Sequence, residues 1–148
     1  MERKEFSILI HGSNETVWNI LWSKETYPEW TAPFCEGSIA ETDWQKGSKV
    51  LFLGPDGGGM VSVISEKIPN EFMSFEHKGV VVNGIEDYTS EMAREWQGSL
   101  EYYRLQARDG KTELFVDMDI ATSHKDYFLS TWPKALQKVK ELAERNEG

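Results

Sequence analysis

The feature that most restricts the fold is a run of strand-like segments, from about residue 35 to residue 120, with only short turns between them. The turns are marked by Gly, Pro, Asn and Asp and stand at residues 43–47, 54–59, 69–70 and 109–110. Asp109-Gly110 is the clearest hairpin turn, because these residues readily adopt the positive φ angles of a two-residue turn. Strands joined by turns this short must be antiparallel, since a parallel pair needs a long crossover.

Before this run, the chain predicts one strand and one or two helices. Phe6, Ile8 and Ile10 alternate along a first strand. Ser13 then predicts the N-cap of a helix, and Pro28 favours a second short helix or turn.

After the run of strands, the chain predicts a long amphipathic helix. Its apolar face repeats at three- and four-residue spacing and consists of Phe128, Trp132, Leu136, Val139 and Ala143. Ser123 and Asp126 resemble a capping box in front of this helix. Pro133 is predicted to start the main helix or to kink it.

This order of elements predicts an α+β protein with one domain over residues 1–148. We expect a curved antiparallel sheet of about six to seven strands that grips the C-terminal helix, with one or two short helices after the first strand. Residues 96–107 are interpreted as one strand. Residues 79–94 are harder to interpret and are predicted to hold a strand end, an exposed loop and a short helical turn.

The net charge of the chain restricts the classes of molecule that it can bind. Sixteen Lys and Arg stand against 25 Asp and Glu, which gives a formal net charge of −9. Such a chain, with no basic stripe, repels phosphate backbones and anionic membrane surfaces, so we expect neither nucleic acid nor membrane as a partner. Cys35 is the single cysteine and cannot form an internal disulfide. With no apolar signal peptide or membrane-spanning run, we expect a cytoplasmic protein.

Four short motifs follow in a familiar order along the chain. They are Glu15-Thr16-Val17-Trp18, Tyr27-Pro28-Glu29-Trp30, Trp44-Gln45-Lys46-Gly47 and Thr131-Trp132-Pro133-Lys134-Ala135-Leu136. Together they resemble the SRPBCC or START-like helix-grip superfamily, in the branch named after the C-terminal domain of the heat-shock-protein-90 ATPase activator. The resemblance spans about residues 6–143. It implies a cavity between the sheet and the C-terminal helix that takes apolar or aromatic small molecules, but it fixes no activity, because superfamily members differ widely in function.

Ten side chains from different expected elements are candidates for binding a ligand. They are Trp30, Phe34, Phe75, His77, Trp96, Tyr102, Met118, Phe128, Trp132 and Leu136. Large rings that carry an N–H or O–H suit a pocket that holds and orients a flat molecule. Met73, Phe75 and His77 are predicted to share one strand face, and the face of Trp96 is predicted to continue to Tyr102. The alternative is that the aromatic side chains simply fill a packed core.

Two of these residues, His77 and Tyr102, are also candidates for catalysis. A cavity-facing His77 could donate a hydrogen bond or act as a general base, whereas the alternative is a histidine at the rim in contact with water. Cys35 has no nucleophile signature around it, so we do not expect it to react. No spacing typical of metal ligands occurs, and we expect neither a metal nor another cofactor.

Three functions stay open. The preferred one is a non-catalytic binder of a small apolar or aromatic ligand, because aromatic faces occur without a catalytic constellation. The second is an enzyme resembling polyketide cyclases or hydrolases that uses a pocket His or Tyr. The third is a co-chaperone-type interaction domain, although we do not expect a chaperone partner, because the additional domain of the eukaryotic co-chaperone and its motif are absent from these residues. An exposed edge strand could also pair two copies into a homodimer.

Overall fold

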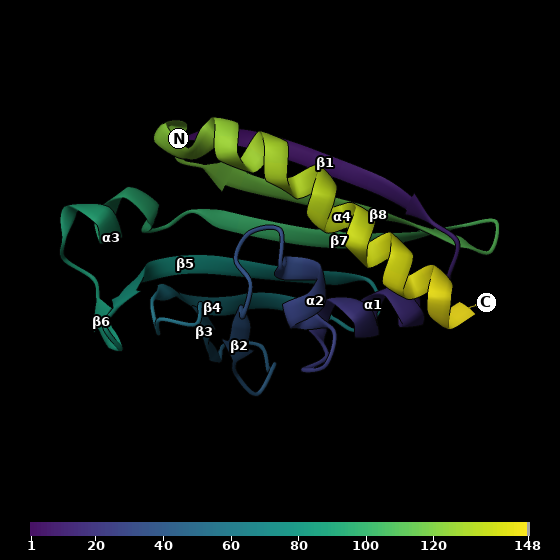
Figure 1. Cartoon of the computed structure of the whole chain (residues 1–148), viewed down its shortest axis with the longest axis horizontal. Coiled ribbons are helices and arrows are strands. Elements are labelled where there is room, and N and C mark those ends of the chain that lie inside the picture. The colour runs from purple at the N-terminus through teal and green to yellow at the C-terminus, as the bar shows by residue number, and fades with distance from the viewer. Residues whose placement is uncertain (148) are drawn as a thin grey trace.

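In the computed structural model, which describes the backbone of residues 1–147 and the side chains of residues 1–145, eight strands form one antiparallel sheet (Figure 1). The long C-terminal helix runs obliquely along this sheet, beside the two N-terminal helices. The elements are β1 (Glu2–Ile10), α1 (Asn14–Trp22), α2 (Tyr27–Thr31), β2 (Ile39–Glu41), β3 (Lys49–Leu53), β4 (Gly59–Ile68), β5 (Phe72–Val82), β6 (Ile85–Asp87), α3 (Glu91–Trp96), β7 (Leu100–Arg108), β8 (Lys111–Ile120), η1 (Thr122–His124) and α4 (Lys125–Glu147).

The strands lie in the order β1-β8-β7-β5-β4-β3-β2, and β6 pairs with the far end of β5. Every pairing is antiparallel, as the short turns predict. At the β7–β8 turn, Asp109 and Gly110 have φ angles of 51° and 80°, which confirms the predicted hairpin. The α+β helix-grip class is confirmed. The two three-residue strands β2 and β6 bring the described sheet to eight strands.

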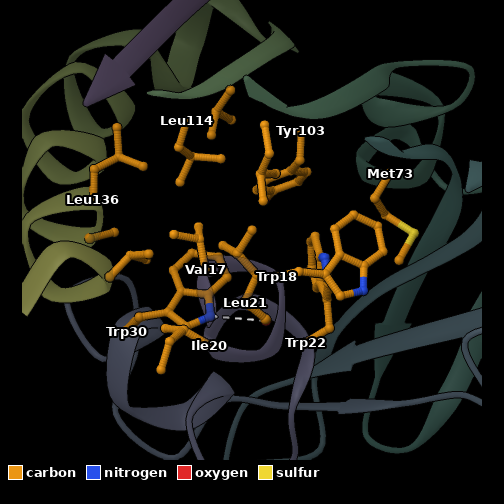
Figure 2. Close-up of a cluster of buried hydrophobic side chains, with 14 of the residues drawn as sticks. Val17, Trp18, Ile20, Leu21, Trp22, Trp30, Met73, Tyr103, Leu114 and Leu136 are labelled. Carbon is orange, nitrogen blue, oxygen red and sulfur yellow. Dashed lines mark hydrogen bonds between the residues drawn. The ribbon is translucent and has the colours of Figure 1, made fainter. Parts of the chain in front are cut away.

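The N-terminal helices pack their apolar side chains into the core beneath α4. Ser13 caps α1, since its hydroxyl accepts a hydrogen bond from the backbone N–H of Thr16 at 3.2 Å. Figure 2 shows that Val17 and Leu21 of α1 lie beside Trp30 of α2 in one apolar cluster. The indole Nε1 of Trp30 donates to the carbonyl oxygen of Leu21 at 3.0 Å, so this buried polar group fixes α2 against the end of α1.

The beginning of the C-terminal helix differs from its sequence prediction. Ser123 does not cap α4: it lies within η1, and its hydroxyl donates to the Glu95 carboxylate at 2.7 Å. Of the two outcomes predicted for Pro133, a helix start is wrong, because α4 already begins at Lys125 and contains the proline in its interior. A kink at Pro133 stays a prediction.

In the segment 79–107, one boundary between a helix and a strand differs from the sequence prediction. Residues 79–94 do hold a strand end, a turn, and the start of a short helix. Trp96, however, is the last residue of α3 and not the first of a strand. Gly98 follows with a φ angle of 85°, and its N–H donates to the His77 carbonyl at 2.8 Å, so β7 begins only at Leu100.

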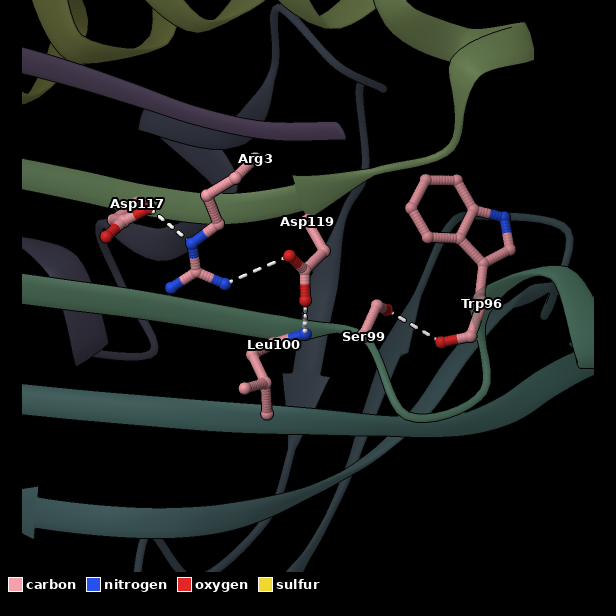
Figure 3. A network of polar contacts seen from close by, with 6 residues as sticks. All are labelled: Arg3, Trp96, Ser99, Leu100, Asp117 and Asp119. Atoms are coloured by element: carbon pink, nitrogen blue, oxygen red, sulfur yellow. Dashed lines mark hydrogen bonds and ion pairs between the residues drawn. The ribbon is translucent and has the colours of Figure 1, made fainter. Parts of the chain in front are cut away.

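The outer face of the sheet carries a polar network at its β1 side (Figure 3). The Arg3 guanidinium donates to Asp117 at 2.6 Å and to Asp119 at 3.1 Å. The second carboxylate oxygen of Asp119 accepts the backbone N–H of Leu100 at 2.9 Å. The two ion pairs join β1 to β8 on the face opposite the core, and the hydrogen bond of Asp119 adds the first residue of β7.

Candidate functional site

A pocket with mainly aromatic walls, here called the aromatic pocket, lies where α2, α3 and α4 meet the inner face of the sheet. Its volume is about 240 Å³. Its aromatic lining consists of Tyr27, Trp30, Phe34, Phe52, Trp96, Tyr103, Phe128 and Trp132. These rings also contact one another: the centroids of Phe34 and Trp132 lie 4.9 Å apart, and those of Trp30 and Trp132 lie 6.1 Å apart. The walls are therefore a connected shell of rings and not isolated side chains.

A wider hollow of about 540 Å³, here called the outer pocket, continues the aromatic pocket toward the surface. The two share several walls, among them Phe34, Trp96 and Phe128. The outer pocket also has exposed residues on its rim, including Met92 and Tyr127. The aromatic pocket therefore adjoins a hollow that reaches exposed residues of α3 and α4.

Seven of the ten predicted ligand-binding residues line the aromatic pocket. They are Trp30, Phe34, His77, Trp96, Met118, Phe128 and Trp132. Phe75 and Leu136 lie instead in the packed core next to it, with 0% and 3% of their surface exposed. For these two residues the packed-core alternative describes the structure.

Tyr102 does not line the pocket, so its prediction as a binding and catalytic residue is wrong. Its ring lies on the outer face, where the Arg3 guanidinium stands 4.7 Å above it and Phe72 lies 5.7 Å away. The residue that faces inward is Tyr103, which is 2% exposed. The error comes from Trp96: counting strand alternation from a residue that belongs to α3 shifts the phase by one residue, and such a shift exchanges the two faces.

A hydrogen-bonded polar cluster reaches the wall of the aromatic pocket and consists of Ser62, His77, Glu101 and Tyr103. The last three line the pocket, and Ser62 is fully buried beside His77. The Ser62 hydroxyl lies 2.6 Å from Nδ1 of His77, and Nε2 of His77 lies 3.2 Å from one carboxylate oxygen of Glu101. The other carboxylate oxygen accepts the Tyr103 hydroxyl. A neutral imidazole satisfies this geometry, with Nε2–H donating to Glu101 and Nδ1 accepting from Ser62. His77 is 6% exposed, so it is not the water-contacting rim residue of the alternative interpretation.

The strands position this cluster through a register shift. Val61 pairs with Gly79, but the next residue, Ser62, pairs with His77, so Lys78 is an extra residue in β5. Directly opposed residues of an antiparallel pair point to the same face, which brings the Ser62 hydroxyl to the imidazole. The backbone of His77 is held as well, since its N–H donates to the Ser99 carbonyl at 2.9 Å.

The two phenols of the pocket are held in their neutral form. Burial raises the pKa of Tyr103 well above its usual 10.0, and the negative charge of Glu101 and the hydrogen bond to it raise it further. Burial, followed by the charge of Glu101, raises the pKa of Tyr27 too. Both phenols therefore remain O–H donors, and Glu101 is the source of negative potential in this pocket.

One wall residue has an unsatisfied polar atom. Nε1 of Trp132 is buried and has no hydrogen-bond partner within the described residues, in contrast to Nε1 of Trp30. The ring of Trp132 instead packs edge-to-face against Phe34 and Tyr103. Trp132 therefore contributes ring surface and not a hydrogen bond to the pocket wall.

Glu101 and Tyr103, together with Tyr27 and Phe52, are pocket residues that the sequence interpretation missed. A signal for the first two exists in β7, where Tyr103 and Leu105 are the buried residues of the alternation. Glu101 has the same parity and must share their face.

Other kinds of site find little support in the part of the chain that the structure describes. Among the side chains of residues 1–145, no group of three or more His, Cys, Asp or Glu could hold a metal ion. Within the same residues, no helix has the length and apolar character to cross a membrane. Cys35 is exposed, and its thiol lies 3.6 Å from the carbonyl oxygen of its neighbour Glu36.

The comparisons with known proteins are informative at the level of the fold. No known protein-family model matches the chain, and no curated protein matches it. Solved structures do match: the Aha1 dimer from Colwellia psychrerythraea has 18% identity and a TM-score of 0.75, with 100% of both chains covered. The AHSA1-like protein from Aeromonas hydrophila has 16% identity and a TM-score of 0.68, with 97% of this chain and 94% of that chain covered. CalU16 from Micromonospora echinospora has 11% identity and a TM-score of 0.67, with 95% and 75% covered. These likenesses, together with the topology, show that the chain has the same helix-grip fold as the Aha1 and AHSA1-like structures.

Proposed function

We propose that the protein binds a small apolar or aromatic molecule in the aromatic pocket. The observation that carries this proposal is the shell of eight aromatic side chains around about 240 Å³, with the polar cluster in its wall. Rings supply apolar surface at low conformational cost, and a few fixed polar groups orient what they hold. The volume lies just below the range of about 300–1,000 Å³ that is usual for drug-sized ligands, which favours a ligand of one or two rings.

We prefer binding over catalysis because the polar groups of the cluster already form hydrogen bonds with one another. Both ring nitrogens of His77 are engaged, one by Ser62 and one by Glu101. A histidine that acts as a general base needs a nitrogen within reach of the substrate proton. An enzyme of the cyclase or hydrolase type remains the second candidate, because the linked Ser62, His77 and Glu101 could rearrange around a substrate. Loss of a detected turnover in His77→Gln, with the fold intact, would support that candidate.

The six tryptophans provide the test of binding. In a two-dimensional ¹⁵N NMR spectrum each indole N–H gives a peak, which single substitutions assign. Planar aromatics, sterols and fatty acids are titrated in turn. We expect the peaks of Trp30, Trp96 and Trp132 to shift together and saturate, because these rings line the aromatic pocket. Trp44 lies outside it and should stay unchanged.

A matched pair of aromatic substitutions separates the pocket from the rest of the surface. Trp96→Ala removes a wall of the pocket and should weaken binding at least about tenfold, which is about 1.4 kcal/mol. Tyr102→Ala removes a ring from the opposite face and should leave the affinity unchanged. If no compound shifts any of the three indoles, or if both variants bind like the wild type, the proposed function is wrong.

Two further expectations stay predictions. The Colwellia neighbour is a dimer, and the edge strands β1 and β2 of this sheet each have one unpaired side. We therefore propose a homodimer through one sheet edge, and sedimentation equilibrium would test it. A chaperone partner is not expected, and an unchanged ATPase rate of the chaperone in the presence of this protein would agree with that.

A further inference from the structure

The charges around the aromatic pocket have one sign. Glu101 lines the pocket with a side chain that is only 14% exposed, and no Lys or Arg lines it among the described residues. His77 is the one basic side chain in the wall, and both of its ring nitrogens already have partners. An anionic group of a ligand would therefore meet a carboxylate and no free cation.

Glu101 also retains capacity to accept hydrogen bonds. A carboxylate offers about four lone-pair positions, and here one oxygen accepts from His77 while the other accepts from Tyr103. Two positions are left, and Glu101 lines the pocket. A ligand with a positively charged N–H group can pair with them, and such a charge-assisted hydrogen bond is about twice as strong as a neutral one.

The aromatic walls favour a cation as well. The rings of Tyr27, Trp30 and Trp132 line the same pocket as Glu101. The ring centroids of Tyr27 and Trp30 lie 5.5 Å apart, and those of Trp30 and Trp132 lie 6.1 Å apart. The electron-rich face of Trp or Tyr attracts a cation within about 6 Å, and the attraction grows when water is excluded. An ammonium beside Glu101 would thus be stabilised by both the carboxylate and the rings.

The outer pocket, which adjoins the aromatic pocket, also carries negative and no positive side-chain charge among the described residues. The outer pocket contains Asp56 and, within the described residues, no Lys or Arg. The whole chain has a net charge of −9, and a field of this sign concentrates cations and repels anions near the surface.

From these observations we infer that the ligand is an organic cation, an amine with an aromatic or compact apolar body whose ammonium group pairs with Glu101. This inference rests on the proposed function, because it names the chemical class of molecule that the aromatic pocket takes. It separates this pocket from one that carries fatty acids, whose carboxylates would be repelled by Glu101.

Three probes of the same shape and different charge test the inference: 2-naphthylmethylamine, 2-naphthalenemethanol and 2-naphthoate. Each is titrated at neutral pH against the indole peaks of Trp30 and Trp132. We expect the amine to bind at least tenfold more tightly than the alcohol and the naphthoate to bind most weakly. In Glu101→Gln the preference for the amine over the alcohol should fall from at least tenfold to less than about twofold.

The control is Glu113→Gln, which makes the same change of charge at a residue paired with Arg108, away from the pocket. It should keep the preference for the amine. Equal affinities for amine and alcohol in the wild type, or tightest binding of the naphthoate, would overturn the inference and leave the proposed function standing. If none of the probes, and no neutral compound of the wider panel, shifts an indole, the proposed function fails first. The wild-type series decides the question even if Glu101→Gln does not fold.

Discussion

Replacement of Tyr103 by Phe tests whether the pocket holds this phenol neutral. In the folded protein the pKa of Tyr103 is raised well above 10.0 by burial and by Glu101. In the unfolded chain the phenol ionises near pH 10, so above this pH the unfolded state binds fewer protons than the folded state. The free energy of unfolding then falls as the pH rises. Below pH 10 both states keep the proton, and the contribution of Tyr103 is fully present.

The magnitude follows from the titration of a single group. Through this phenol the wild type loses about 0.4 kcal/mol of its free energy of unfolding at pH 10 and about 1.4 kcal/mol at pH 11. Tyr103→Phe escapes this loss because it has no phenol. At neutral pH, however, the variant is less stable by about 2 kcal/mol, since the carboxylate of Glu101 loses one of its donors. The stabilities of the two proteins therefore converge as the pH rises.

Urea unfolding, followed by tryptophan fluorescence at about pH 8, 10 and 11, measures this convergence. We expect the gap in free energy between wild type and Tyr103→Phe to narrow by about 1.4 kcal/mol between the lowest and the highest pH. Tyr102→Phe removes a phenol from the outer face of the same strand and controls for the loss of a tyrosine. A gap that stays constant over this range would refute the reasoning, because it would mean that Tyr103 ionises equally easily in both states.

Three further substitutions have effects that the packing predicts, and urea unfolding measures each. Gly59→Ala should cost at least about 3 kcal/mol, because its Cβ would lie 1.7 Å from the carbonyl oxygen of Phe52, whereas Gly54→Ala, whose Cβ would meet nothing closer than 3.5 Å, should cost little. Thr112→Val should cost about 1–3 kcal/mol, because it removes a buried hydroxyl that donates to a backbone carbonyl at 2.8 Å. Arg3→Met should cost at most about 1 kcal/mol, with a smaller cost at high salt, because its ion pairs are partly exposed. Equal stabilities for the two glycine variants, an unchanged Thr112→Val or a salt-independent Arg3→Met would each contradict the corresponding argument.

Much of the fold could be predicted because its signals are local. A turn such as Asp109-Gly110 fixes an antiparallel neighbour within a few residues, and Ser13 marks the start of α1 in the same way. The wrong predictions concern places where a local sequence pattern is compatible with two different structures. Ser123 has the composition of a helix cap but is used by η1, and its hydroxyl finds Glu95 of a distant segment. No pattern around Ser123 contains that partner.

The candidate site could be predicted only in part, for a related reason. Side chains on strands and helices with a clear period, such as Met118 and Trp132, could be assigned to the inner face. The alternation in β7 was assigned one residue out of phase, so Tyr102 took the place of Tyr103 and Glu101 was missed. The contacts of His77 depend on an extra residue in β5, and such a bulge is set by how the strands pair and not by the composition of either strand.

The position of the pocket follows from the way the sheet divides at β5. Over residues 72–76 this strand pairs with β7, but over residues 80–82 it pairs with β6 instead. His77 lies at this division, where the turn before β7 hydrogen-bonds to its backbone and β6 takes the place of β7 beside the end of β5. Near this division His77 of β5 and Glu101 of β7 both point to the inner face of the sheet, so these polar groups lie in the wall of the aromatic pocket and not in the apolar core beyond it. The same division places Trp96 of α3 opposite Phe128 of α4, with ring centroids 5.9 Å apart, at the opening of the pocket. Ligand access should therefore depend on the position of α3 and of the turn at Gly98. A shift of these two segments should leave the apolar core under α1 largely unchanged.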